Sequence, residues 1–166
     1  MSDNSVSDSF RAAHKIQAYA KIAIQIAKIS GFSPIITTAS LRNADMLKGI
    51  GATHVLDRNL PTSALSEEIM KITSKPLQIV YDAISLPATQ NAAFDVLAPG
   101  GHLVLVLPDA IDAAKKAAEP SKKIVVLAGT EEIYAEDNSV WSKLTELVEE
   151  GLIKVCGVSL ITLILC

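Results

Sequence analysis

The sequence predicts an α/β domain in which a parallel sheet is covered by helices on both faces. Two observations lead to this prediction. Short segments rich in β-branched residues alternate with helical segments, at the spacing of β-α-β units. Hydrophobic residues make up 49% of the 166 residues and aromatic residues only 4%, so the core must consist mainly of Ile, Leu, Val and Ala. Such an aliphatic core is typical of a parallel sheet buried on both faces.

The N-terminal part predicts a short tail followed by a long helix. Residues 1–8 are polar and are expected to form a disordered tail, and residues 9–166 a single domain. A helix is predicted from Phe10 to Ser30, with a cap among residues 7–9 and a stop at Gly31. Its polar stripe consists of Lys21, Gln25 and Lys28. Because apolar residues cover most of the rest, this helix should be largely enclosed by its neighbours.

The remaining elements follow in order. Five parallel strands are predicted at Pro34–Ser40, Thr53–Asp57, Leu77–Ala83, His102–Leu107 and Lys123–Ala128. Helices are predicted at Leu41–Ile50, Ser63–Ser74, Pro87–Leu97 and Val140–Glu150, the last capped by Asn138 or Ser139. The segment Asp109–Glu119 fits either a short helix or a loop, and Val155–Cys166 predicts a further strand.

Composition excludes several classes of function. The net charge is −3 and no basic stripe is present, which argues against nucleic acid as a partner. Cys156 and Cys166 form neither a metal-binding spacing with His nor a disulfide framework, so no metal site is expected. The N-terminus lacks an apolar signal core, and the longest apolar run, Val158–Cys166, is shorter than the ~20 residues that span a bilayer. We therefore expect a cytoplasmic protein with no membrane partner.

The segment from Ile22 to Asn59 is the most informative one. It predicts helix, strand, helix and strand, in the order of a dinucleotide-binding half-domain. In such a domain a strand and a glycine-rich turn come just before the first helix. Here the preceding residues, RAAHKIQAYAK, contain no glycine. The sequence therefore predicts a nucleotide-binding scaffold that lacks the first strand and the phosphate-binding turn.

Four phrases in the sequence resemble one known family. They are AIQIAKISGFSPIITTAS, NADMLKGIGATHVLDR, QIVYDAIS and AFDVLAPGGHLVLVLP, and they cover Ala23 to Pro108, with a looser pattern to about Gly151. In order and spacing they resemble the cofactor-binding domain of the medium-chain dehydrogenase/reductase family. The closest likeness is to the zinc-free branch of quinone oxidoreductases and fungal trans-acting enoyl reductases. The resemblance implies a Rossmann-like fold.

The resemblance also implies what this chain lacks. Members of the family carry an N-terminal catalytic domain, which has no counterpart here, and the chain departs from the family pattern after Lys154. We therefore expect a chain truncated at both ends and given a new tail.

A first group of candidate cofactor-binding residues follows the first predicted strand. By resemblance, the adenosine ribose lies against the end of this strand, and the candidates there are Thr38, Ser40, Arg42 and Asn43. An acidic residue would bind the 2′-hydroxyl of NAD, but none is present. A hydroxyl and a guanidinium suit the 2′-phosphate of NADP instead. The alternative is a helix cap at Ser40 and a solvated arginine.

A second group follows the third and fourth predicted strands. By resemblance, Asp82, Ala83 and Ile84 lie beside the adenine and ribose, and Leu107 and Pro108 near the nicotinamide. The alternative is ordinary strand termination, with Asp82 capping the next turn. No catalytic residue can be identified from spacing.

Two functions remain open at this point. The first is a truncated NADPH-dependent enoyl or quinone reductase-like protein, weakly active or inactive alone, because no glycine turn holds the pyrophosphate. The second is a non-catalytic binding or interaction protein, such as a secreted effector or an oligomer, that reuses the scaffold for a small molecule, a nucleotide or a partner.

A gap in the expected sheet leads to the last prediction. In the family sheet the missing strand lies between Pro34–Ser40 and Leu77–Ala83, and an empty place would leave backbone groups unpaired in the core, at about 1–3 kcal/mol each. The best candidate to fill it is Val158–Ile164 with its flanks, within its own chain or swapped into a second copy as a homodimer. The alternative is direct pairing of the two flanking strands, which leaves the tail at an edge or disordered.

Overall fold

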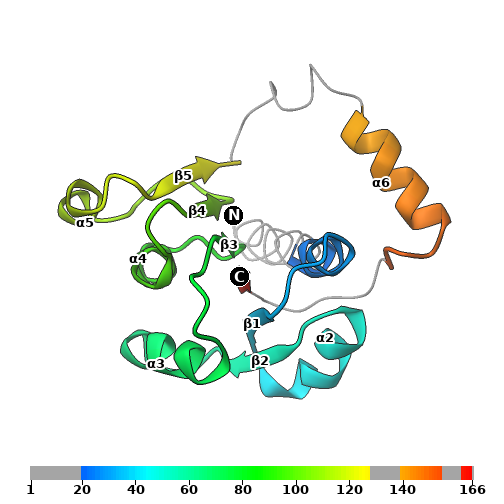
Figure 1. Ribbon diagram of the computed structural model, residues 1–166, viewed down its shortest axis with the longest axis horizontal. Helices are drawn as coiled ribbons and strands as arrows, with labels where there is room; N and C mark the ends of the chain where they lie inside the picture. Colours follow the sequence, from blue (N-terminus) through cyan, green and yellow to red (C-terminus); the bar gives the residue numbers. More distant parts are fainter. Residues whose placement is uncertain (1–19, 128–138, 155–161, 166) are drawn as a thin grey trace, which may run out of the picture.

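The computed structural model describes residues 20–127, 139–154 and 162–165. Within this part of the chain six strands form one sheet in the order β2-β1-β6-β3-β4-β5 (Figure 1). The strands are β1 (Ile35–Ala39), β2 (His54–Asp57), β3 (Ile79–Asp82), β4 (His102–Leu105), β5 (Lys123–Val126) and β6 (Thr162–Leu165).

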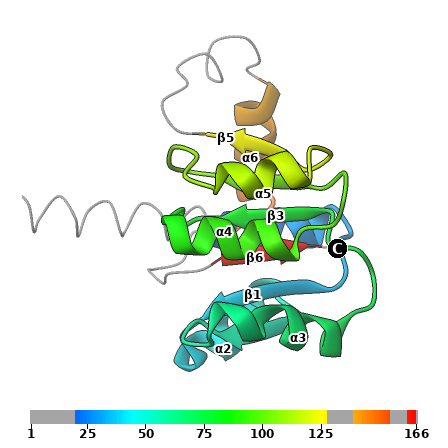
Figure 2. The ribbon, with the colours of Figure 1, turned by 90° about the vertical axis from the view of Figure 1, so that its left-hand side faces the viewer.

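Helices cover both faces of this sheet. They are η1 (Leu41–Asn43), α2 (Ala44–Ile50), α3 (Thr62–Ile72), α4 (Pro87–Val96), α5 (Ala113–Ala118) and α6 (Ser139–Glu149), in addition to a helix through residues 20–29. The helix through residues 20–29 and α2 lie on one face, and α3, α4 and α5 lie on the other (Figures 1 and 2). The predicted α/β fold class is confirmed.

The alternation of side chains along β1 divides the core into two layers. Ile35 is fully buried in one cluster with Ile24 of the first helix and Leu47 of α2. The next residue, Ile36, belongs to the other cluster, together with Phe94 of α4. Successive strand residues point to opposite faces, so an uninterrupted run of Ile and Val can supply both layers at once.

The five predicted strands are confirmed, with some shorter bounds. β1 pairs with β2, β3 with β4, and β4 with β5, all in parallel. The fourth strand ends at Leu105 instead of Leu107. The amide of Val106 donates to the Ser85 side chain (2.9 Å), and this bond draws the chain out of the ladder.

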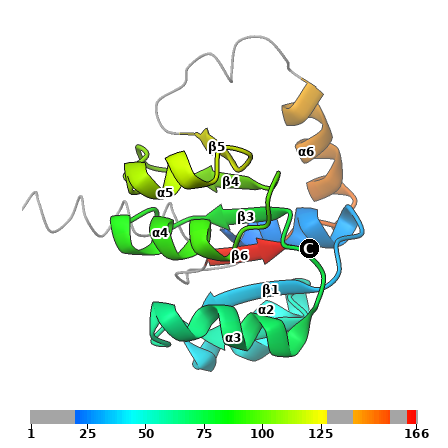
Figure 3. The same cartoon turned by 60° about the vertical axis from the view of Figure 1, so that its left-hand side comes forward.

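The central place in the sheet is filled by β6. It lies between β1 and β3 and runs antiparallel to both, with Thr37 and Tyr81 paired to Leu163 from either side (Figure 3). The prediction that the C-terminal segment fills the gap is confirmed, and direct pairing of β1 with β3 is wrong. The strand ends at Leu165, one residue beyond the predicted core segment, while residues 158–161 lie outside the described residues.

The exposed face of the first helix differs from the prediction. The prediction that Lys21 and Gln25 belong to a polar stripe on the outside of the first helix is wrong, because these residues are only 2% and 4% exposed. Ile26 and Ile29 of the same helix are 42% and 44% exposed. Gln25 is turned inward because its side chain hydrogen-bonds to the backbone of Lys154.

The segment Asp109–Glu119 forms a short helix, α5, whose N-terminus is capped by Asp112 through a bond of 2.7 Å from the amide of Ala114. The predicted tail 1–8, the helix before residue 20 and the Asn138 cap lie outside the described residues.

Candidate functional site

The parallel strands all end at one edge of the sheet, and the loops after β1, β2, β3 and β4 meet there. Ligands of open α/β sheets bind outside this carboxyl edge. A cavity of about 90 Å³ opens there between the sheet, α3 and α4. Its lining consists of Thr38, Asp57, Arg58, Leu60, Thr62, Leu65, Val80, Ile84, Thr89, Ala92, Ala93 and Val96.

The lining has an apolar and a polar part. Val80 of β3, Leu65 of α3 and Ala93 of α4 give apolar walls. The polar lining comes from strand ends and the first turns of helices, including Thr38 and Arg58. A pocket for a whole drug-sized ligand measures about 300–1,000 Å³. This cavity is therefore large enough for only a part of such a ligand.

The structure places the predicted residues of the first group at this edge but not all in the cavity. Thr38 lines it. Ser40 is the N-cap residue of η1, as the alternative predicted, but its side chain makes no capping hydrogen bond. Arg42 is exposed and Asn43 is half-buried, and neither lines the cavity. Their role toward a cofactor stays a prediction.

Arg58 lines the cavity but is not among the residues predicted from the sequence. Its amide donates to the carbonyl of Ala39 (3.0 Å), which ties the end of β2 to the end of β1. Its exposed side chain lines the cavity beside Asp57, whose carboxylate accepts from the amide of Asn59 (2.9 Å). Arg58 directly follows a predicted strand, so its place at the carboxyl edge could have been read from the sequence.

The predicted residues after β3 divide between three environments. Ile84 lines the cavity, while Ala83 is buried in the core on the opposite face. The carboxylate of Asp82 is fully buried and accepts from the amides of Ile84 and Ser85 (both 3.0 Å) and from the hydroxyl of Thr89 (2.7 Å). These contacts are the turn-capping role that the alternative predicted. Ser85 takes a positive φ of 52°, an uncommon backbone geometry for a residue other than glycine.

Leu107 and Pro108 lie outside the cavity, in the loop after β4. Leu107 is 38% exposed. The carbonyl of Pro108 accepts a hydrogen bond from the side chain of Gln90 in α4 (3.0 Å). The predicted residues therefore form two places along one edge: the cavity near β1 and β3, and this loop beyond β4.

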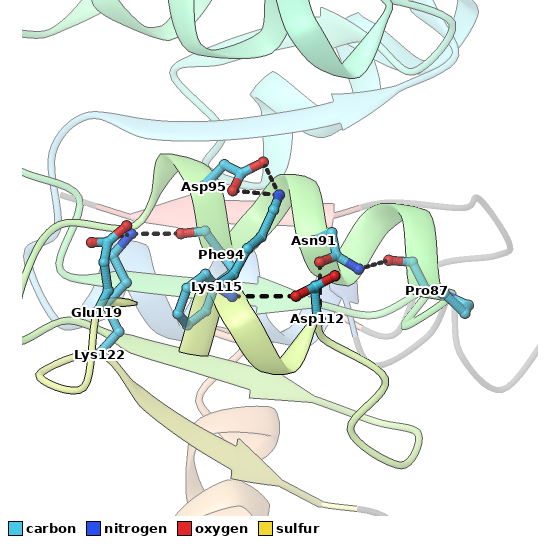
Figure 4. Close-up of polar contacts among 8 residues, drawn as sticks. All are labelled: Pro87, Asn91, Phe94, Asp95, Asp112, Lys115, Glu119 and Lys122. Carbon is cyan, nitrogen blue, oxygen red and sulfur yellow. Dashed lines mark hydrogen bonds and ion pairs between the residues drawn. The ribbon is translucent and has the colours of Figure 1, made fainter. Parts of the chain in front are cut away.

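Charged side chains near α4 and α5 are occupied in structural contacts (Figure 4). The buried ammonium of Lys122 donates to the carbonyl of Phe94 near the C-terminus of α4 (2.8 Å), pairs with Glu119 (2.8 Å) and lies 4.7 Å from the Phe94 ring centre. A cation there satisfies a free carbonyl and complements the helix dipole. Lys115 pairs with Asp95 at 2.7 Å. Lys115 therefore links α5 to α4, and Lys122 links the turn before β5 to α4.

The pKa of one carboxylate in the loop after β4 is shifted. Burial alone would raise the pKa of Asp109. Hydrogen bonds from the Lys116 ammonium (2.7 Å) and the Ile111 amide (2.9 Å) outweigh that effect and hold this pKa below its ordinary value. Asp109 is therefore an ionised anchor for α5 near neutral pH.

Two classes of feature do not occur in the described ranges. No group of three or more His, Cys, Asp or Glu side chains there could hold a metal ion. None of the helices described is long and apolar enough to cross a membrane.

The strand order and the helices on both faces define a Rossmann-like α/β domain, with a cavity at the carboxyl edge where sheets of this kind bind their ligands. The family model of zinc-binding dehydrogenases matches residues 20–150, and the chain belongs to this family. The resemblance to the cofactor-binding domain of medium-chain dehydrogenases/reductases is thereby confirmed.

Curated relatives include fungal trans-enoyl reductases. The chain is 39% identical over 80 residues to trans-enoyl reductase FSL5 of Gibberella zeae, which covers 48% of this chain and 21% of the relative. It is 28% identical over 149 residues to trans-enoyl reductase cghC of Chaetomium globosum, covering 80% and 39%. The chain thus spans well under half the length of these relatives.

Solved structures share the fold. The CurK enoyl reductase superposes with a TM-score of 0.66 at 22% identity, covering 87% of this chain and 43% of that one. An NADPH:quinone reductase of Bacillus thuringiensis, described as putative, gives a TM-score of 0.68 at 21% identity, covering 84% and 44%. At these identities the likeness shows the fold alone.

Proposed function

We propose that this chain is an NADPH-binding domain of the enoyl or quinone reductase type. The observation that supports it best is the cavity at the carboxyl edge, with Arg58 in its lining and no carboxylate among residues 38–43. The zinc-binding dehydrogenase family already implies a nicotinamide cofactor-binding fold. The preference for the phosphorylated form is our proposal.

The residues present suit the adenosine half of this cofactor. The apolar walls from Val80, Leu65 and Ala93 suit the faces of a purine ring. Arg42 and Arg58 follow neighbouring strands at the same edge, where planar guanidinium groups can donate two parallel hydrogen bonds to a 2′-phosphate. The carboxylate of Asp57, by contrast, is engaged with the amide of Asn59.

The residues suit the pyrophosphate less well. A Rossmann domain holds it at a glycine-rich turn between its first strand and first helix. In this sequence the first glycine is Gly31, after the first helix, and the central place in the sheet belongs to the antiparallel β6. We therefore expect the adenosine half to supply most of the affinity.

The proposed chemistry follows the family. Bound NADPH would supply a hydride to an activated C=C bond or a quinone. We propose that the chain alone is weakly active or inactive, because the residues before the first helix contain no glycine-rich turn to hold the pyrophosphate and so to position the nicotinamide. We further propose a cytoplasmic location, and a homodimer formed through an outer sheet strand or by exchange of β6.

Calorimetric titration tests this function. Purified chain is titrated with NADPH, NADH and adenosine 2′,5′-bisphosphate. Micromolar binding of NADPH and of the bisphosphate, with weaker NADH binding, is the expected result. Absence of binding at millimolar cofactor would contradict the proposal and favour a non-catalytic interaction protein on the same scaffold.

A further inference from the structure

The loops after β3 and β4 are joined by one buried side chain. Gln90, on the first half of α4, is fully buried. Its amide nitrogen donates to the carbonyls of Ser85 (2.8 Å) and Pro108 (3.0 Å), and its amide oxygen accepts from the backbone amide of Ala110 (2.7 Å). A glutamine side chain has two N–H donors and one carbonyl acceptor, and all three groups are used here.

A second side chain joins the same two loops. The hydroxyl of Ser85 donates to the carbonyl of Asp82 (2.6 Å) and accepts from the amide of Val106 (2.9 Å). The backbone of Ser85 is held at positive φ, a geometry that persists only where its surroundings fix it. Gln90 and Ser85 therefore set the position of the loop that carries Leu107 and Pro108, relative to the turn that carries Ile84.

This arrangement is more specific than the fold requires. The carbonyls of Ser85 and Pro108 belong to loops at the carboxyl edge of the sheet, and the backbone groups of such surface loops usually bond to water. Every donor and acceptor of the buried Gln90 amide is hydrogen-bonded to the backbone of these two neighbouring loops, which makes the loops one rigid unit. Ile84 in this unit lines the cavity, whereas Pro108 lies beyond it.

We infer that Gln90 is a positioning residue that aligns the β4 loop with the cavity, so that an extended ligand contacts both. The inference rests on the proposed function: the adenosine half occupies the cavity, and the remainder of the dinucleotide runs along the edge past Ile84 toward Leu107. Gln90 touches no part of the ligand. It acts through the carbonyl of Pro108 and the amide of Ala110.

The test compares two ligands in two variants. Gln90→Met keeps the volume and removes all three hydrogen bonds. The matched control is Asn91→Ala in the same helix. Asn91 accepts a hydrogen bond from the amide of Asp112 (3.1 Å), so this variant also removes a bond to the loop after β4, at a point beyond Ala110. Calorimetry measures the affinity of each folded variant for NADPH and for adenosine 2′,5′-bisphosphate.

We expect Gln90→Met to weaken NADPH at least tenfold and the bisphosphate less than twofold, with Asn91→Ala changing neither by more than twofold. A structural defect alone would weaken both ligands together, so equal losses, or no loss, overturn the inference and leave the proposed function standing. Wild-type protein that binds neither ligand overturns the proposed function, and this inference with it.

Hydrogen exchange of the ligand-free protein gives a second readout. The amide of Ala110 should exchange at least tenfold faster in Gln90→Met than in wild type, while the β1 amides keep their rates. Unchanged exchange at Ala110 would show that Gln90 does not hold this loop, and would overturn the inference whatever the binding results.

Discussion

The side-chain amide of Gln25 pairs with both backbone groups of Lys154. Its nitrogen donates to the Lys154 carbonyl (3.0 Å), and its oxygen accepts from the Lys154 amide (2.7 Å). The nitrogen also lies 3.2 Å from the carbonyl of Lys21, one turn earlier in the same helix. These two hydrogen bonds have the donor and acceptor pattern of a residue pair in a β-sheet, and they hold the chain after α6 against the first helix. Beside it, Ile153 is 2% exposed.

Gln25→Leu should destabilise the protein. It leaves the amide and carbonyl of Lys154 without their partners, and an unsatisfied, partly buried backbone group costs about 1–3 kcal/mol. Urea unfolding followed by circular dichroism measures the change in unfolding free energy. The control is Lys28→Ala, an exposed position on the same helix, which should shift it by less than about 0.5 kcal/mol. Equal effects of both substitutions would contradict this role.

Deletion of residues 157–166 should unfold or aggregate the protein. It removes β6, which pairs with β1 on one side and β3 on the other. The loss opens two rows of backbone groups at the centre of the sheet, in a domain that is stable by only about 5–15 kcal/mol. Circular dichroism and size-exclusion chromatography read the outcome. Cys166→Ser, which leaves β6 intact, is the control, and a soluble deletion variant that unfolds cooperatively would contradict the prediction.

The sequence was sufficient for much of this fold because its main signals are local. Alternating strands and helices predict the parallel strands. Unpaired backbone in the expected gap makes Val158–Ile164 with its flanks the best candidate to fill it, and β6 at Thr162–Leu165 occupies this place. The direction of β6 could not be predicted, since it depends on which edge of the sheet the chain reaches after Lys154. The burial of Gln25 was missed for a similar reason: its partner lies 129 residues away.

The candidate site was predicted less completely. Thr38 and Ile84 were chosen from strand ends and do line the cavity. Its other walls belong to α3 and α4, and which of their residues face the sheet depends on helix packing that a short motif does not encode. Nothing in the sequence indicated that Gln90 is buried between two loops, because a glutamine on an amphipathic helix is ordinarily predicted to be exposed.

Arg42→Ala should weaken NADPH more than NADH. Only NADPH carries the 2′-phosphate, and a charge-assisted hydrogen bond contributes about 1.5–3 kcal/mol, which corresponds to a loss of about 10- to 150-fold. Calorimetric titration of both cofactors measures it, and Arg58→Ala should show the same discrimination. Lys71→Ala on α3, outside the cavity lining, is the control. Equal weakening of NADPH and NADH would count against a phosphate site at these arginines.

The purified chain should show little or no reductase activity alone. No glycine-rich turn precedes the first helix, since the first glycine is Gly31, so the pyrophosphate and the hydride-donating ring attached to it would be poorly held. Oxidation of NADPH is followed by its absorbance in the presence of a simple quinone or an enone. Robust, protein-dependent turnover of either substrate would refute the prediction, provided that heat-inactivated protein shows none.

The ion pair of Asp109 with Lys116 should make stability depend on pH in acid. The pKa of Asp109 lies below its ordinary value in the folded protein, because the bonds from Lys116 and the Ile111 amide outweigh burial. A depressed folded pKa means that the pair stabilises the fold fully above the unfolded pKa of about 3.9. This stabilisation is lost as pH falls through the folded value.

Asp109→Asn tests this dependence, because it keeps an oxygen for the Ile111 amide while it removes the charge. At pH 7 the variant should be less stable than wild type, by at most about 1 kcal/mol for a partly exposed pair, and the difference should be smaller at pH 3, below the unfolded pKa. Urea unfolding at both pH values measures it. In a double-mutant cycle with Lys116→Met the interaction energy at pH 7 should account for most of the loss. A difference that stays the same at pH 3 would assign the effect to packing of the loop after β4 and not to the charge of Asp109.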